Sequence, residues 1–147
     1  MTRITEYLIS IRRILKCQEA MLKEIGEEYA LTLTEATIIS FLHNNPGRDT
    51  AADIVELRML SKGHVSQAVE SLIQKSLLRR RQDTADRRRI HLYLTSAAQP
   101  IVEAIDRRWK GLEEIIFQGL TPDDRQSLTR ITNQMMENLQ NAMTRER

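Results

Sequence analysis

The residues whose chemistry stands out in this sequence are basic, and they are concentrated between Ser61 and Thr95. This stretch holds eight lysines and arginines against three acids, a net charge of +5, whereas the whole chain of 147 residues carries only +2. A reader of duplex DNA needs such a concentration of cations to meet the phosphates, although an arginine run is more often only a solvated surface. The charge alone leaves both interpretations open.

The pattern within this stretch predicts a helix, a strand, a charged turn and a second strand. Ser61 is expected to cap the helix, because its hydroxyl can accept a backbone N–H of the first turn. Val65, Val69 and Leu72 recur at helical spacing and predict one buried face, with a polar face opposite. The alternation in Ile90–Leu94 predicts a returning strand with one buried face.

Two shorter helices are expected before Ser61. Thr32 with Glu35, and Thr50 with Asp53, have the spacing of capping boxes, and Pro46 lies in a turn that ends the first of these helices. A short helix, a tight turn and a second helix with a polar outer face make a helix-turn-helix. The two strands that follow would make it winged.

Long apolar stripes at both ends of the chain predict three further helices. They cover about 3–29, the segment after Thr95, and the segment that starts with the Thr121-Pro122 cap. Their stripes are expected to pack against one another, within one chain or across a dimer. The predicted fold class is therefore mainly α (α+β winged helix-turn-helix), with six helices and a two-stranded β-wing in one domain of ordinary size.

The wing sequence DRRRIHLYLT at 86–95 resembles the D-x-R followed five residues later by L-T of MarR-family transcriptional regulators. The segment 60–80 is similar to that family's recognition helix and first wing strand, and the resemblance extends over nearly the whole chain. It implies a helical dimerisation region at 1–30 and 96–147 and a winged DNA-binding region at 31–95. A monomeric bundle attached to a winged domain is the alternative.

Docking as a winged helix-turn-helix would put the helix from Ser61 into the major groove and the wing along the minor groove. Gln67 is expected to read a base edge, and Arg88 to enter the minor groove. Asp86 is expected to be structural, holding the turn of the wing. The residues predicted to contact DNA are Ser61, Lys62, Gly63, His64, Ser66, Gln67, Arg79, Arg81, Arg87, Arg88 and Arg89.

The resemblance also implies a function: a regulator, in most relatives a repressor, that binds palindromic double-stranded DNA as a homodimer. A small-molecule or oxidative signal would release it. Candidate walls of an effector pocket are Tyr29, Phe41, His43 and Trp109, although core packing is the more common role of each. The single cysteine, Cys17, is expected to be a buried filler of the first helix, with a redox-sensing thiol as the alternative.

Other functions find little support in the sequence. It has no glycine-rich phosphate loop, C-x-x-C, H-E-x-x-H or nucleophile elbow, so no enzyme activity and no cofactor are expected. The three histidines lie far apart and predict no metal site. No apolar run approaches the roughly 20 residues of a membrane span, so a cytoplasmic protein is expected. The competing hypothesis is a helical interaction module whose winged unit binds protein rather than DNA.

Overall fold

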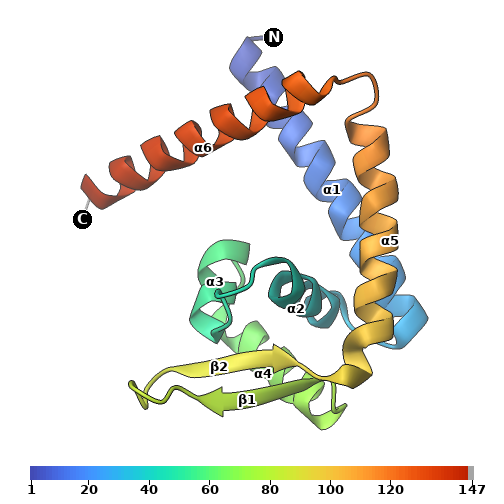
Figure 1. Cartoon of the computed structure of the whole chain (residues 1–147), viewed down its shortest axis with the longest axis vertical. Helices are drawn as coiled ribbons and strands as arrows, with labels where there is room; N and C mark the ends of the chain where they lie inside the picture. Colours follow the sequence, from blue (N-terminus) through green and yellow to red (C-terminus); the bar gives the residue numbers. More distant parts are fainter. Residues whose placement is uncertain (146–147) are drawn as a thin grey trace. The chain divides into compact units, whose positions relative to one another are not determined.

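The computed structural model describes residues 1–145. In this part of the chain, six α-helices accompany one antiparallel sheet of two strands, which confirms the predicted fold class (Figure 1). The elements are α1 (Arg3–Tyr29), α2 (Leu33–Asn44), α3 (Ala51–Arg58), α4 (Lys62–Gln74), β1 (Leu78–Gln82), β2 (Ile90–Leu94), a 3-10 turn η1 (Ser96–Ala98), α5 (Gln99–Ile116) and α6 (Pro122–Arg145). They form two compact units, Met1–Leu112 and Glu113–Arg147.

The predicted caps start the helices of the first unit. The Thr32 hydroxyl accepts the backbone N–H of Glu35 at 3.1 Å, and the Glu35 carboxylate accepts the N–H of Thr32 at 3.0 Å. Thr50 and Asp53 make the same reciprocal pair at the start of α3. The Ser61 hydroxyl accepts the N–H of His64 at 3.2 Å. Each cap satisfies backbone donors that have no partner inside the helix, so the local sequence sets where these helices begin.

The core of the first unit lies where the apolar faces of α1, α2, α4, α5 and the sheet meet. Figure 1 shows α2 and α3 on one side of the strands, with α4 beside them. The predicted inner face of α4 is buried at Val65, Val69 and Leu72. The largest fully buried side chains are Leu22, Ile25, Ile38, Ile39, Ile54, Leu72, Leu78, Ile105 and Val65.

A buried carboxylate joins the start of α2 to the end of α4. Glu35 is only 2% exposed, and besides capping α2 it accepts hydrogen bonds from Ser71 Oγ at 3.0 Å and Lys75 Nζ at 2.9 Å. Lys75 Nζ also donates to the carbonyl of Ala30, just after α1. Burial acts to raise the pKa of Glu35, but the hydrogen bonds from the Thr32 backbone and from Lys75 outweigh it and hold the pKa below its ordinary value.

The connection from α1 to α2 depends on a glycine. Ala30 takes the left-handed conformation at φ 56°, and the N–H of Leu31 donates to the carbonyl of Gly26 at 2.8 Å. A Cβ on Gly26 would lie 2.6 Å from the carbonyl oxygen of Leu31, closer than such contacts occur. The sharp exit from α1 therefore requires the absence of a side chain at position 26.

The second unit consists of the end of α5, a turn and α6. The predicted Thr121 cap is present, since the Thr121 hydroxyl accepts the N–H of Asp124 at 3.1 Å and the Asp124 carboxylate accepts the N–H of Thr121 at 2.9 Å. The guanidinium of Arg125 lies 4.9 Å from the centre of the Phe117 ring. None of the residues described in α6 is buried. An amphipathic helix of 24 residues with no buried face lacks the packing that normally stabilises one.

One expectation about a single residue was wrong. Cys17, expected to be a buried filler, is exposed on α1. Among residues 1–145, no helix has the length and hydrophobicity that crossing a bilayer requires.

Replacing Lys75 with methionine should destabilise the protein by about 1–3 kcal/mol, because the buried Glu35 carboxylate loses its charged donor. Chemical denaturation at neutral pH measures the free energy of unfolding. The matched control is Lys23→Met: Lys23 pairs with Glu19 at 3.8 Å, both side chains are at least half exposed, and the change should cost less than about 0.5 kcal/mol.

The same network predicts an acid dependence. Because the pKa of Glu35 is lowered by folding, its contribution is fully present above the ordinary value of 4.5 and is lost as pH falls through the lowered value. If Lys75→Met and Lys23→Met lowered the free energy of unfolding equally, Lys75 would not be the donor on which the buried Glu35 carboxylate depends.

Candidate nucleic-acid interface

The outer face of α4 presents a row of polar side chains to solvent. Lys62, His64, Ser66 and Gln67 are exposed, and so is Gly63 in the first turn. Within residues 1–145, no hydrogen bond or ion pair engages the side chains of Lys62, Ser66 or Gln67. These three side chains are therefore free of internal partners, and the buried opposite face of α4 fixes the direction in which they point.

The wing divides its arginines between two faces. In the antiparallel register Arg80 stands opposite Leu92, which is buried, whereas Arg79 and Arg81 stand opposite Tyr93 and His91. Opposite residues in an antiparallel pair point to the same side of the sheet, so Arg79 and Arg81 share the face away from the core.

The third arginine of β1 is used within the fold. Arg80 forms an ion pair with Glu70 on α4, which ties the sheet to the outer side of that helix. This leaves Arg79 and Arg81, the two arginines of β1 predicted to contact DNA, as the candidates.

The turn between the strands is held by its acidic residues. One oxygen of Asp83, Oδ1, accepts the backbone N–H groups of Ala85 and Asp86 at 2.8 and 2.9 Å. Asp86 Oδ1 in turn accepts the N–H of Arg88 at 3.0 Å, which supports the structural role expected of Asp86. Asp83 was not among the predicted residues, although an aspartate at the start of a polar turn is a known signal for such bonds.

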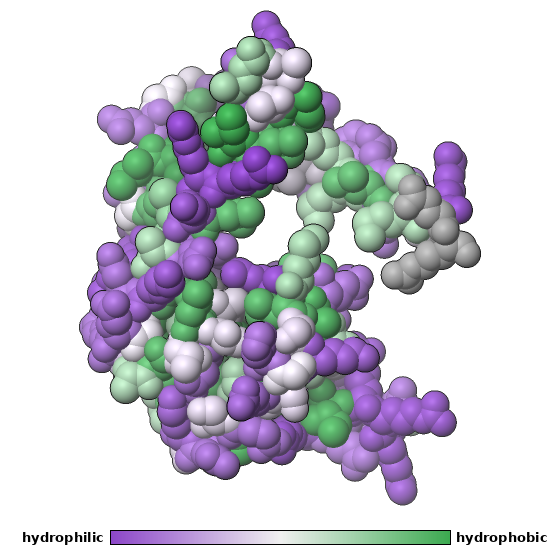
Figure 2. Space-filling view, turned by 180° about the vertical axis from the view of Figure 1, so that it is seen from behind, coloured by the Kyte–Doolittle hydropathy of each residue, from purple (hydrophilic) through white to green (hydrophobic). Residues whose placement is uncertain are grey.

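Three consecutive guanidiniums project from this turn. Arg87, Arg88 and Arg89 are all exposed, and no ion pair among the described residues engages them. Figure 2 shows long hydrophilic side chains extending into solvent from the tip of the wing, at the lower right of that view. Free cations on a hydrogen-bonded backbone suit contacts to phosphate or to a narrow minor groove.

His91, on β2, makes contacts that the sequence did not reveal. Its Nδ1 lies 2.7 Å from Asp49 Oδ1, and its Nε2 lies 2.7 Å from Asp83 Oδ2. The bond to Asp49, followed by that to Asp83, raises the pKa of His91. The bond from His91, with the backbone N–H groups of Asp86 and Ala85, holds the pKa of Asp83 far below its usual range.

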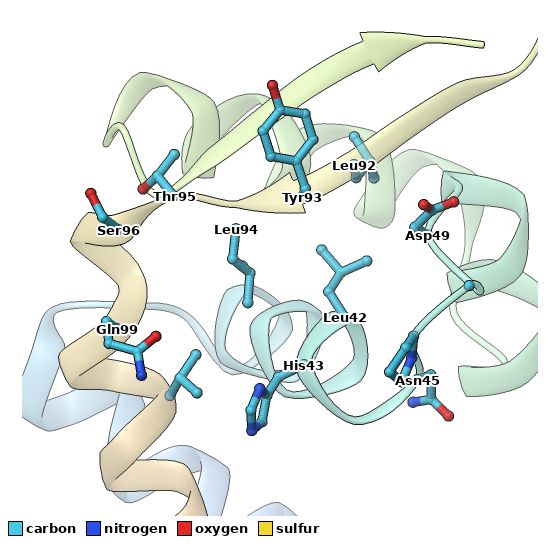
Figure 3. A pocket seen from close by; sticks show the side chains of 13 residues that line it. Leu42, His43, Asn45, Asp49, Leu92, Tyr93, Leu94, Thr95, Ser96 and Gln99 are labelled. Carbon is cyan, nitrogen blue, oxygen red and sulfur yellow. The ribbon is translucent and has the colours of Figure 1, made fainter. Parts of the chain in front are cut away.

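The four residues expected to line an effector pocket do not surround one cavity. Tyr29 and Trp109 are partly buried against the core, and Phe41 is 4% exposed within it. His43 does line a cavity of about 470 Å³ between the end of α2, β2 and the start of α5 (Figure 3). Its Nε2 also lies 2.9 Å from Asp106 Oδ1.

The described residues contain no cluster of three or more histidine, cysteine or acidic side chains suited to a metal ion. His43, His64 and His91 lie on α2, α4 and β2, and two of them already have carboxylate partners. The chemistry of this surface is thus that of cations and hydrogen-bonding groups.

Comparison with known proteins agrees with this geometry. Residues 31–89 match the model of the MarR family. An uncharacterized HTH-type transcriptional regulator of Bacillus subtilis, YwaE, is 28% identical over 86 residues, which cover 58% of this chain and 50% of that protein. The chain thus aligns with half the length of this curated relative.

Solved structures share the fold over most of the chain. A MarR-family transcriptional regulator from Silicibacter pomeroyi is 23% identical with a TM-score of 0.75, covering 91% of this chain and 88% of that one. A putative MarR-family regulator from Listeria monocytogenes, solved with a 26mer DNA, is 18% identical with a TM-score of 0.75, covering 92% and 89%. The Staphylococcus aureus MepR–DNA complex is 21% identical with a TM-score of 0.64, covering 94% and 98%.

At these identities the solved structures establish the fold alone, and the family model matches the segment that carries α2, α3, α4, β1 and the wing turn. Residues 31–89 thus match the MarR family of transcriptional regulators, and the chain has the fold of solved MarR-family structures.

Proposed function

We propose that the protein is a sequence-specific transcriptional repressor that binds a palindromic operator in double-stranded DNA as a homodimer. One observation carries the proposal: the free polar face of α4 belongs to the same compact unit as the three unpaired guanidiniums of the wing. A helix of this kind reads base edges in the major groove, while wing cations meet the backbone and minor groove. The relatives solved with DNA support this use of the fold.

The division of roles follows from side-chain chemistry. Gln67 offers an amide that can both donate and accept, as adenine requires, and Ser66 offers a smaller contact. Lys62, beside the helix start, suits a phosphate. Arg88 is proposed to enter the minor groove, with Arg87 or Arg89 on phosphates. A cytoplasmic location, as expected from the sequence, is part of the proposal.

Exposed apolar side chains support the homodimer. The first half of α1 exposes large hydrophobic residues, as does α6, in which none of the described residues is buried. Contiguous apolar stripes on long helices are costly to leave in water and are typical of helix–helix interfaces. The exposed members are Ile4, Leu8, Ile14 and Leu15 on α1, and Leu128, Ile131, Met136, Leu139 and Met143 on α6.

DNA binding should depend steeply on salt. A dimer that makes some 6–10 phosphate contacts should lose about 10³–10⁵ in affinity between about 50 and 200 mM salt. Fluorescence anisotropy with duplex DNA from upstream of the protein's own gene measures this dependence. If the protein shows no affinity for this DNA or for selected palindromes, the competing hypothesis of a protein-interaction module gains.

Two substitutions distinguish contacts that position the protein on DNA from contacts that read the base sequence. Arg88→Ala should weaken binding to every sequence and reduce the salt slope, whereas Gln67→Ala should relax preference at one base pair per half-site, worth about 1–3 kcal/mol. The matched control is Arg107→Ala, an exposed arginine on α5 outside the proposed contact face, which should leave the binding curve unchanged. Unchanged affinity and slope in Arg88→Ala would refute the role given to the wing.

The oligomeric state is tested on α6. Ile131→Glu places a charge in the exposed apolar stripe and should shift the protein toward monomer in sedimentation velocity, since an unpaired charge is costly at a buried interface. Asn133→Glu adds the same charge at a neighbouring polar position and should leave the sedimentation coefficient unchanged. A wild-type monomer at all concentrations would exclude the homodimer.

The release signal is proposed to be a small molecule or an oxidant. For the oxidant, the exposed thiol of Cys17 is the candidate, since thiol oxidation requires access. An organic hydroperoxide should then weaken DNA binding by wild type but not by Cys17→Ser, with dithiothreitol restoring it. Equal responses of both proteins would leave the small-molecule route, for which His43, in the wall of the cavity beside β2, is the proposed contact.

A further inference from the structure

A histidine on β2 bridges two loops that are far apart in the sequence. The ring of His91 is about one fifth exposed, and it lies between Asp49, in the loop before α3, and Asp83, at the start of the wing turn. Both ring-nitrogen to carboxylate distances are 2.7 Å. The arrangement thus links the body of the helix-turn-helix to the wing.

Both contacts can be hydrogen bonds only when the ring is charged. A carboxylate only accepts, so each ring nitrogen has to donate, and only the imidazolium carries an N–H on both nitrogens. A neutral ring would turn one lone pair toward a carboxylate oxygen and lose that bond. The bridge as observed is therefore that of a protonated histidine.

Each carboxylate in the bridge also organises backbone. Asp83 uses its second oxygen to hold the N–H groups of Ala85 and Asp86, two residues before the exposed arginines. Asp49 directly precedes Thr50, the cap of α3. The backbone carbonyl of Asp49 accepts the N–H of Leu92 at 2.7 Å. The ring of His91 therefore fixes the wing turn against the loop that begins α3.

We propose that His91 is a positioning residue for DNA binding, whose charged ring holds the wing turn so that Arg87, Arg88 and Arg89 are presented in a fixed arrangement. When the ring loses its proton, the turn is released from the body of the domain and affinity for DNA falls. This inference rests on the proposed function, and it adds a dependence on pH that the arginines themselves do not have.

Other charged groups lie on the elements that pack against β2, but none of them forms a hydrogen bond or ion pair with the His91 ring. They are Arg79, Arg80 and Arg81 on β1, Glu35 and His43 on α2, and Asp53, Glu56 and Arg58 on α3. Arg81 is the cross-strand neighbour of His91. Within the described residues, the charges that act on the ring are those of Asp49 and Asp83.

The sign of the pH dependence follows from these two carboxylates. They raise the pKa of His91 above its ordinary value of 6.5, so the bridge is fully charged below that pH and is lost as pH rises through the raised value. Asp83 stays ionised over this range, because its pKa is held far below its usual value. DNA affinity should thus be highest on the acid side of the transition.

The experiment compares three proteins by anisotropy with the same upstream duplex DNA, from about pH 6 to about pH 9 at constant ionic strength. All carry His64→Gln, because histidines in general change charge in this range and His64 lies on the proposed contact face. His91→Gln offers an uncharged amide, and His91→Arg keeps a charge and two donors at every pH.

In the parent protein, which carries only His64→Gln, affinity should fall roughly ten- to hundredfold as pH rises, the loss expected for one charged hydrogen bond. His91→Gln should bind weakly and without this slope, and His91→Arg should restore tight binding at every pH. Affinity and slope in His91→Gln equal to those of the parent would overturn the proposal.

A second measurement needs no DNA and no variant. Hydrogen-exchange protection factors of the Ala85 and Asp86 amides, corrected for intrinsic rates, should fall in the free protein as His91 deprotonates. Constant protection across the range would overturn the proposal even if DNA binds. Failure of all proteins to bind DNA, with protection falling as expected, would instead refute the DNA-binding function and leave the bridge intact.

Discussion

The position of α4, the helix proposed to read DNA, depends on one buried carboxylate. Glu35 completes the cap of α2 and at the same time accepts hydrogen bonds from Ser71 and Lys75 at the end of α4. A buried acid without such donors would be costly, so the arrangement tolerates few alternatives. These bonds hold α4 at its C-terminal end. The side chains proposed to contact DNA lie in its N-terminal half and take no part in them.

The wing follows the same rule with other residues. The carboxylates of Asp83 and Asp86 accept backbone N–H groups within the wing turn. The arginines of the wing therefore have no carboxylate partners there. Arg80 is the exception, because it shares the inner face with Leu92 and pairs with Glu70. The local excess of positive charge therefore reaches solvent instead of being neutralised within the fold.

The features that could be predicted from sequence are those whose partners lie within a few residues. Capping pairs three residues apart, the buried face of α4 and the alternation in β2 depend only on local geometry. The Glu35–Lys75 and His91–Asp49 contacts join residues about 40 positions apart, so they exist only once the fold has brought them together. The exposure of Cys17 escaped prediction because the apolar stripe runs along the whole of α1, whereas its buried residues all lie after Cys17, from Met21 to Gly26.

The two units differ in how much apolar surface they bury, and this difference bears on the proposed function. The winged region has a core, satisfied caps and polar networks, and it leaves the polar side chains on the outer face of α4 and the arginines of the wing turn free. By contrast, α6 has no buried residue among those described, so a second chain would give its stripe the apolar contacts it lacks. One winged unit offers one recognition helix and one wing, and two units related by a two-fold axis would double the contacts and require a palindrome. The exposed apolar stripe of α6 and the unpaired arginines of the wing turn are thus both accounted for by the proposed homodimer on DNA.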